Sequence, residues 1–219
     1  MTLMTHHQAF VDRGPIRWLQ IACFALIVRP LVWLVLGVNL RGGELVPRQG
    51  PAIIVANHNS HLDTLVLMSL FPLARLHMVR PVAAADYFLR NRLLAWLSLR
   101  VIGILPLERG SCGVHDPLAL AQQALERGEI VLVFPEGSRG DPECPERLKP
   151  GIAHLARRLP EVPLIPVHLE GLGKALPRGE GLLVPFICDI WVGGALYWQG
   201  DRVTLMGQLE TWLFQRPSR

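Results

Sequence analysis

A histidine and a carboxylate lie five residues apart in a short polar segment of the sequence. His58 follows the apolar run 52–56, and Asp63 precedes a second apolar stretch. A carboxylate that bonds one ring nitrogen of a histidine fixes the tautomer and stabilises the protonated ring. The other nitrogen is then free to take a proton from a hydroxyl group, a step that accelerates reactions by about 10²–10⁴-fold. A catalytic pair is therefore one interpretation of this segment.

A helix cap is a second interpretation of the same residues. Ser60 and Asp63 have the S-x-x-D spacing of a capping box, which begins helices ahead of apolar stretches. In that case Asp63 starts the helix expected over residues 64–71, and His58 is an ordinary loop residue. The local sequence does not choose between a cap and a catalytic pair.

A metal site is a third interpretation. Its candidate ligands are His58, His61 and Asp63, with another from elsewhere in the chain, such as His77 or His168. Imidazole and carboxylate groups are common zinc ligands. However, the H-x-x-H-x-D spacing differs from the H-E-x-x-H pattern of zinc proteases, so we expect no metal here.

A second segment with residues suited to chemistry is FPEGSR, at residues 134–139. Gly137 allows the backbone to approach a ligand closely, and Arg139 can pair with a phosphate through two hydrogen bonds. Glu136 could orient that arginine or bind a substrate hydroxyl. Taken alone, however, proline, glycine and serine after a strand are also typical of a surface turn.

Alternating apolar strands and helical stretches must position these two segments. The expected strands cover residues 52–56, 77–83, 102–107, 130–134 and 162–169. The expected helices cover residues 64–71, 86–100, 115–127, 152–159 and 203–214. Apolar strands that alternate with helices predict an α/β fold, with a mostly parallel sheet flanked by helices on both faces.

The first part of the chain is strongly apolar. Residues 18–40 have roughly the 20 residues that a transmembrane helix needs. Arg29 and Pro30 stand in the middle, where an arginine costs about 2.5–3.5 kcal/mol and a proline breaks or kinks a helix. We therefore expect residues 1–48 to form a helical hairpin that enters one leaflet from the cytoplasmic face, with residues 49–219 as one α/β domain. A pair of buried core helices is the alternative.

The composition limits the classes of partner. Hydrophobic residues make up 50% of the 219 residues and charged residues 18%, with a net charge of +4. The basic residues are nearly all arginine, which suits anionic lipid or a phosphorylated substrate. They form no dense basic cluster, so we expect no nucleic-acid partner. The four cysteines are scattered and are typical of reduced thiols in the cytoplasm.

The two motifs together resemble a known family. H-x-x-x-x-D at residues 58–63, followed by FPEGSR, is similar to the glycerolipid acyltransferases, the relatives of bacterial 1-acylglycerol-3-phosphate acyltransferase. Two looser blocks, residues 103–109 and 164–167, agree in order. The resemblance extends from about residue 50 to residue 171.

This resemblance implies transfer of an acyl group from a thioester, acyl-CoA or acyl carrier protein, to a hydroxyl. By analogy, His58 is the general base and Asp63 orients it, and backbone N–H groups near His58 are candidates to stabilise the oxyanion. A set of polar and glycine residues would bind the acceptor. These are Arg109, Glu136, Gly137, Ser138, Arg139 and Lys149. Neither an enzyme nucleophile nor a cofactor is expected, because a base is enough to activate the alcohol.

The acceptor is the least defined part of this interpretation. The resemblance favours 1-acylglycerol-3-phosphate, which would give phosphatidate, in a membrane-associated enzyme. An acidic stretch at residues 141–146 would repel an anionic headgroup. An ornithine lipid or another lysophospholipid therefore stays open as the acceptor. A non-enzymatic membrane adaptor and a metal-dependent hydrolase are the alternatives to acyl transfer.

Overall fold

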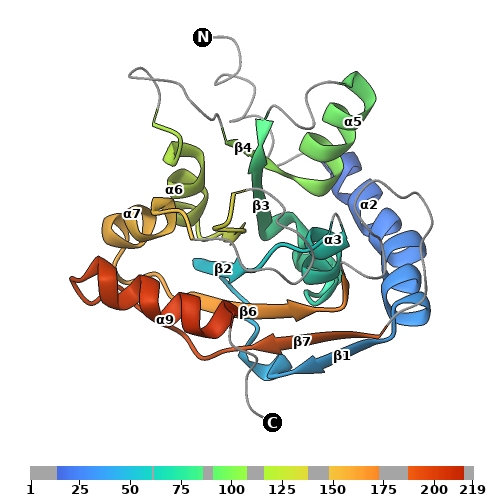
Figure 1. The fold of residues 1–219 in the computed structure, drawn as a ribbon. Coiled ribbons are helices and arrows are strands. Elements are labelled where there is room, and N and C mark those ends of the chain that lie inside the picture. Colours follow the sequence, from blue (N-terminus) through green and yellow to red (C-terminus); the bar gives the residue numbers. More distant parts are fainter. Residues whose placement is uncertain are drawn as a thin grey trace.

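The computed structural model describes residues 14–60, 62–85, 91–107, 116–137, 148–172 and 187–214. Within them, seven strands form one sheet in the order β1-β7-β6-β2-β5-β3-β4 (Figure 1). The strands are β1 (Val38–Arg41), β2 (Ala52–Ala56), β3 (Val79–Ala84), β4 (Leu105–Leu107), β5 (Ile130–Val133), β6 (Leu164–Glu170) and β7 (Cys188–Val192). All neighbouring pairs are parallel except β6 and β7, which confirms the predicted α/β class.

The strand β2 occupies the centre of the sheet, and all five of its residues are buried. Ile53 and Val55 point to one face of the sheet, while Ile54 and Ala56 point to the other. A strand that is covered on both faces reads as a continuous apolar run, which explains why the sequence predicted it within its observed bounds.

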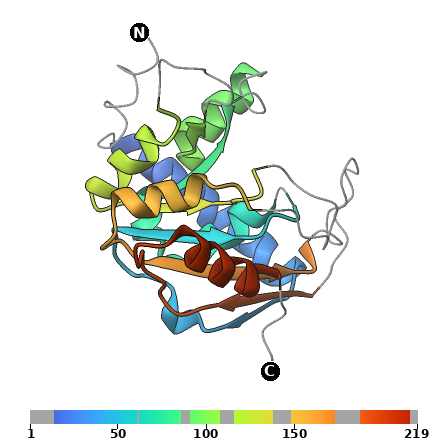
Figure 2. The ribbon, with the colours of Figure 1, turned by 60° about the vertical axis from the view of Figure 1, so that its left-hand side comes forward.

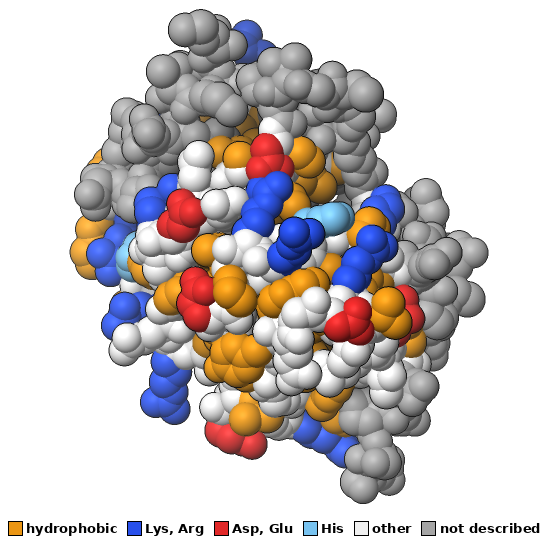
Figure 3. Space-filling view, turned by 90° about the vertical axis from the view of Figure 1, so that its left-hand side faces the viewer, with side chains coloured by type: hydrophobic (Ala, Val, Ile, Leu, Met, Phe, Trp, Pro, Cys, Tyr) orange, Lys and Arg blue, Asp and Glu red, His pale blue; other side chains and the backbone are white. Residues whose placement is uncertain are grey.

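Three helices cover the first face of the sheet. They are α6 (Ala119–Glu126), α7 (Gly151–Arg158) and α9 (Arg202–Phe214), and they lie on the same side in Figure 2. Each turns apolar residues inward. On the outer side of α7, His154, Arg157 and Arg158 are exposed. Charged side chains of both signs lie among apolar ones on this side of the molecule (Figure 3), as is typical of a surface in contact with water.

The second face is covered by α3 (Leu62–Ser69) and by the N-terminal helix. That helix consists of α2 (Gly14–Cys23) and two π-helical stretches, η2 (Phe24–Val28) and η3 (Leu31–Val35). Shorter helical segments complete this side of the chain. They are η4 (Gly43–Leu45), η5 (Leu73–Met78), α5 (Arg92–Trp96) and η6 (Leu97–Ile102).

The N-terminal helix does not turn back at Arg29 and Pro30, so the predicted helical hairpin is wrong. Both residues have helical backbone angles, and the backbone N–H of Arg29 bonds the carbonyl of Phe24. Proline has no backbone N–H to donate, and its ring crowds the preceding turn of an α-helix. Here wider π-helical turns on either side accommodate the ring. The guanidinium of Arg29 donates to the carbonyl of Phe71 at 2.6 Å and to that of Ser69 at 3.4 Å. These carbonyls at the end of α3 satisfy the charge inside the protein, so no turn toward water is needed.

The outer side of this helix is apolar. Residues Gly14–Leu34 form a helix long and apolar enough to cross a membrane, and 22% of an 18-residue apolar stretch of this helix is buried inside the protein. Phe24, Val28 and Val32 face the core. Large apolar side chains face away from it. They are Trp18, Leu26, Ile27 and Leu34, with exposed fractions of 71%, 76%, 63% and 82%.

Sequence reasoning missed two strands and misplaced one. β1 and β7 are short and pair with each other at the edge of the sheet. Strand β4 is shorter than the predicted 102–107, because Ile102 ends a helix and Gly103 adopts a left-handed conformation with φ +81°. An apolar run alone does not show where a helix stops and a strand starts.

Candidate active site

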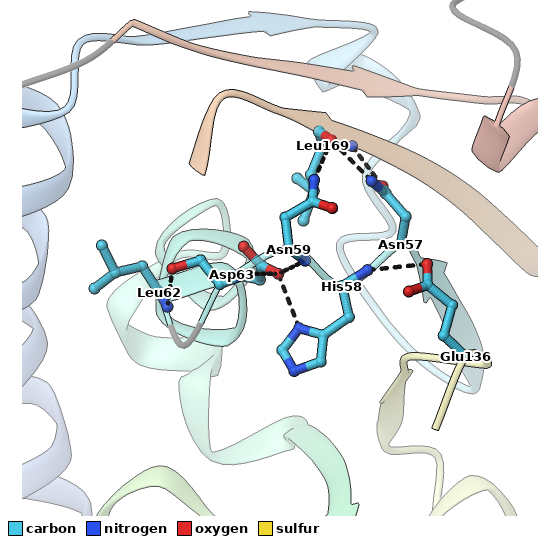
Figure 4. A network of polar contacts seen from close by, with 8 residues as sticks. Asn57, His58, Asn59, Leu62, Asp63, Glu136 and Leu169 are labelled. Carbon is cyan, nitrogen blue, oxygen red and sulfur yellow. Dashed lines mark hydrogen bonds and ion pairs between the residues drawn. The ribbon is translucent and has the colours of Figure 1, made fainter. Parts of the chain in front are cut away.

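The candidate site lies where three parallel strands end at the same edge of the sheet. His58 comes two residues after β2, Glu136 comes three residues after the neighbouring β5, and Leu169 is near the end of β6 on the other side. Figure 4 shows these residues converging around His58. Ligands of open α/β sheets usually bind outside the carboxyl ends of the strands.

The predicted histidine–aspartate pair is formed. His58 Nδ1 lies 2.8 Å from Asp63 Oδ2, and the histidine side chain is 19% exposed while the aspartate is fully buried. Asp63 Oδ2 also accepts the backbone N–H groups of Asn59 at 2.6 Å and Ser60 at 2.8 Å. Because this carboxylate oxygen accepts both backbone N–H groups, it favours the tautomer of His58 with the proton on Nδ1, which leaves Nε2 as a hydrogen-bond acceptor.

The capping box is present as well. Ser60 Oγ accepts the backbone N–H of Leu62 at 3.3 Å, while Asp63 reaches back to the N–H of Ser60. The same oxygen of Asp63 therefore caps α3 and orients His58. The helix cap and the histidine–aspartate contact therefore coexist, because the cap holds the carboxylate where the imidazole meets it.

The FPEG segment forms the other wall of the site. The ring of Phe134 stacks on that of His58, with centroids 4.2 Å apart and an angle of 24° between the planes. Glu136 is 3% exposed, and its Oε1 accepts the backbone N–H of His58 at 3.2 Å. The two motifs meet because β2 pairs directly with β5.

Gly137 and Lys149 lie against each other in this wall. Gly137 has φ +72°, and a Cβ built on it would stand 2.5–2.8 Å from Nζ, Cδ and Cε of Lys149. The backbone N–H of Lys149 also bonds the carbonyl of Pro135 at 2.8 Å. The absence of a side chain at residue 137 thus leaves room for the lysine beside the motif. The predicted binding residues Arg109, Ser138 and Arg139 lie outside the described residues.

Two asparagines beside His58 were missed by sequence reasoning. Asn57 Nδ2 donates to the carbonyl of Leu169 at 2.8 Å, and Asn57 Oδ1 accepts the N–H of Leu169 at 2.7 Å. Asn59 Nδ2 donates to the same carbonyl at 2.9 Å. The only available signal was an amide side chain on each side of the histidine, which does not reveal a partner 110–112 residues away.

Three described backbone N–H groups at His58 and the two residues after it are already bonded and are not free to stabilise an oxyanion. Those of Asn59 and Ser60 donate to Asp63, and that of His58 donates to Glu136. These three groups therefore do not form the oxyanion hole expected near His58, and His61 lies outside the described residues. They instead hold the two carboxylates that shape the site.

The candidate metal ligands do not form a metal site in the part of the chain that the structure describes. No group of three His, Cys, Asp or Glu side chains with suitable geometry occurs there. Burial, followed by the charges of Arg17 and Arg80, lowers the pKa of His77, and the same positive charges would repel a metal ion. His168 Nδ1 bonds the carbonyl of Leu213 at 2.7 Å, which ties this histidine to α9.

Residues 37–170 match the protein family described as Acyltransferase. The chain belongs to the Acyltransferase family. This match covers more than half of the 219 residues and contains both motifs of the site. Together with the relatives described below, this match confirms the predicted resemblance of the chain to glycerolipid acyltransferases.

Several relatives of this acyltransferase are named for one activity. The chain is 30% identical to the chloroplastic 1-acyl-sn-glycerol-3-phosphate acyltransferase LPAT1 of Arabidopsis thaliana over 67% of this chain and 40% of that protein. It is 31% identical to the 1-acyl-sn-glycerol-3-phosphate acyltransferase alpha of Ovis aries over 71% of this chain and 52% of that one. The chain thus spans 40–52% of the length of these two curated relatives.

A crystal structure shows the same fold. It is that of the 1-acyl-sn-glycerophosphate acyltransferase PlsC from Thermotoga maritima. The two structures superpose with a TM-score of 0.73 at 21% identity, covering 100% of this chain and 89% of the other. At this level of identity, the likeness establishes the architecture.

Proposed function

We propose that this acyltransferase transfers an acyl group from acyl-CoA or acyl carrier protein to the hydroxyl of a lysophospholipid. The simplest acceptor is 1-acylglycerol-3-phosphate, which would give phosphatidate. The observation that carries the proposal is the bond of 2.8 Å between His58 Nδ1 and the buried Asp63 Oδ2 at the carboxyl edge of the sheet. The relatives named 1-acyl-sn-glycerol-3-phosphate acyltransferase support the class of acceptor.

The reaction follows from the two ring nitrogens of His58. Nε2 points away from Asp63 (Figure 4), and no described residue bonds it. It takes the proton of the acceptor hydroxyl as the oxygen attacks the thioester carbonyl. The tetrahedral intermediate then expels the thiolate, which receives the proton back from the imidazolium. Asp63 stabilises the imidazolium between these two steps, and Phe134 holds the ring plane.

Among the described residues, Lys149 is a cation placed to bind the negatively charged phosphate of the acceptor. Its side chain lies over Gly137, next to Glu136 and therefore next to the loop that contains His58. An ammonium group is a common point of contact for phosphate. The lysine would hold the phosphate of the acceptor and leave its hydroxyl at His58.

The exposed apolar face of the N-terminal helix supports association with a membrane. Trp18, Leu26 and Leu34 are covered only to a small extent by the described part of the chain. Burial of such side chains in lipid stabilises them in the same way as burial in a core. The described residue Cys23 has a free thiol, which suits the reducing cytoplasmic side.

The test is acyl transfer by purified protein in mixed lipid micelles. Wild type and His58→Ala are assayed with acyl-CoA and acyl carrier protein as donors, and with lysophosphatidate and uncharged lysolipids as acceptors. We expect the loss of the base to lower kcat by at least about 10²-fold. His154→Ala is the matched control, because this histidine is exposed on α7, away from the described site contacts.

Three outcomes are informative. Activity of wild type with another lysolipid, but not with lysophosphatidate, would change the acceptor and retain the mechanism. Equal activity of wild type and His58→Ala would eliminate the general base. Absence of transfer by wild type with every donor and acceptor would eliminate the proposed function itself.

A further inference from the structure

Asn57 bonds the backbone of β6 as another strand would. The ladder between β2 and β6 ends at the pair Ala56 and Val167, after which the chain leaves the sheet. Beyond this point, the amide of Asn57 donates to the carbonyl of Leu169 at 2.8 Å and accepts its N–H at 2.7 Å. An asparagine side chain has the same donor and acceptor as a peptide group. It therefore extends the ladder by one step while the backbone turns away.

The second asparagine reaches the same point on β6. Asn59 Nδ2 donates to the carbonyl of Leu169 at 2.9 Å, so this one oxygen accepts two amide donors. In Figure 4, the side chains of Asn57 and Asn59 point to Leu169, and the ring of His58 points the opposite way. This alternation is that of an extended chain, in which residues i and i+2 share a side. Fixing the two asparagines on β6 therefore fixes the direction of the histidine between them.

The direction of His58 determines whether the catalytic pair exists. Nδ1 must lie opposite Asp63 Oδ2, which is buried and held by α3, and so cannot follow a displaced ring. The interaction of the two side chains is set at 2.8 Å. A displacement of about 1 Å in a reacting group can lower the rate of a reaction by about 10²-fold.

We infer that Asn57 is a positioning residue that aims His58 at Asp63 and the acceptor hydroxyl by clamping Leu169. Both hydrogen bonds of its side chain go to the backbone of Leu169, so its effect on the reaction passes through the histidine. Asn59 assists through one bond where Asn57 makes two. This inference rests on the proposed function for its kinetic consequence, but the geometry it concerns is independent of the reaction.

A double-mutant cycle tests the inference by kinetics. Asn57→Ala removes both bonds to Leu169, and we expect kcat to fall about 10²-fold with little change in KM for either substrate. When His58 is already alanine, the same substitution should change the remaining rate less than about 2-fold, because a positioning residue has nothing left to position. Asn39→Ala is the matched control. Its exposed amide bonds Asp189 on the neighbouring strand, at the edge of the sheet, so kcat should stay as in wild type.

A merely structural role of Asn57 would give a different result. It would lower the amount of folded protein, or lower the rate by the same factor with and without His58, and equal factors would overturn the inference. If Asn57→Ala does not fold, the cycle is run with Asn57→Asp and Asn59→Ala. The first retains the acceptor for the N–H of Leu169, and the second retains both Asn57 bonds.

A magnetic resonance measurement separates this inference from the proposed function. In protein labelled with ¹⁵N-histidine, the proton on Nδ1 of His58 should give a signal protected from exchange, which His58→Ala removes and so assigns. We expect Asn57→Ala to abolish it while Asn39→Ala leaves it unchanged. An unchanged signal in folded Asn57→Ala would overturn the inference even if acyl transfer is confirmed. Loss of the signal would support it even if no acceptor is found.

Discussion

The segment Asn57–Asp63 and the N-terminal helix Gly14–Val35 differ in how their side chains meet their surroundings. In the first, the amides of two asparagines and three backbone N–H groups have partners inside the protein, while Oδ1 of Asp63 has none among the described residues. In the second, apolar side chains are left outside, with Leu26 and Leu34 exposed by 76% and 82%. The polar groups of the site thus bond mainly to one another, whereas the helix exposes an apolar surface that the described part of the chain does not cover.

The contrast extends to the two faces of the sheet. The helices α6, α7 and α9 bury apolar residues, and exposed charged residues such as Arg157 lie on the outer side of α7. The N-terminal helix buries Phe24 and Val28 in the same manner but is apolar on both sides. Substitutions in one region should therefore leave the property of the other region unchanged.

The largest effect is expected from Asp63→Asn. The amide would present either a weaker acceptor or a donor to Nδ1 of His58, and a donor forces the wrong tautomer. We expect kcat to fall about 10²–10⁴-fold, with binding to lipid vesicles unchanged. Asp189→Asn is the matched control, because this carboxylate bonds Asn39 at the sheet edge. Full activity of Asp63→Asn would show that the carboxylate serves only as a cap.

The second effect concerns the helix. Leu26→Ser combined with Leu34→Ser should weaken binding to anionic lipid vesicles by about 10²-fold, since each leucine contributes about 1.5–3 kcal/mol when fully buried. The rate with a short-chain acceptor in solution should be that of wild type. Val203→Ser, at a residue 77% exposed on α9, is the control and should bind vesicles normally. An equal loss of vesicle binding in Val203→Ser would mean that the protein does not bind vesicles through the N-terminal helix in particular.

A smaller effect is expected at the one charge inside the apolar helix segment Phe24–Val35. Arg29→Met removes the hydrogen bonds to the carbonyls of Ser69 and Phe71. A hydrogen bond of a charged group contributes about 1.5–3 kcal/mol to the stability of a protein. We expect the free energy of unfolding in urea to fall by about 1–3 kcal/mol, with vesicle binding retained. Arg17→Met, which loses an exposed bond to Ala74, should cost less. Stability equal to wild type would contradict the structural role of Arg29.

The smallest effect is a pH dependence of the free energy of unfolding that comes from Cys188, a buried residue whose pKa is affected by Asp63. Burial, followed by the charges of Asp63 and Asp189, raises the pKa of Cys188 from 9.0 to about 11. The unfolded chain loses this proton near pH 9 and the folded chain near pH 11, so the folded state becomes relatively less stable as the pH rises between them. Cys188→Ala should flatten the slope of stability over that range in chemical unfolding. A slope that persists unchanged in the variant would assign it to other groups.

The sequence by itself determined what depends on neighbouring residues. His58 and Asp63 meet across one turn at the start of a helix, a geometry that their spacing already encodes. The fully buried strand β2 is an uninterrupted apolar run, and the FPEG motif follows the next central strand. These features are local, so their residue types and spacing were sufficient to predict them.

The tertiary structure alone decided which distant groups meet. Asn57 and Leu169 are 112 residues apart, and no local pattern indicates that an amide completes the ladder with β6. The edge strand β1 became evident only through its pairing with β7. From the sequence, Arg29 indicated a turn exposed to water. The carbonyls that accept its hydrogen bonds, those of Ser69 and Phe71, lie at and just after the end of α3, about 40 residues further along the chain. Burial and long-range hydrogen bonds override local preference whenever the partner lies elsewhere in the chain.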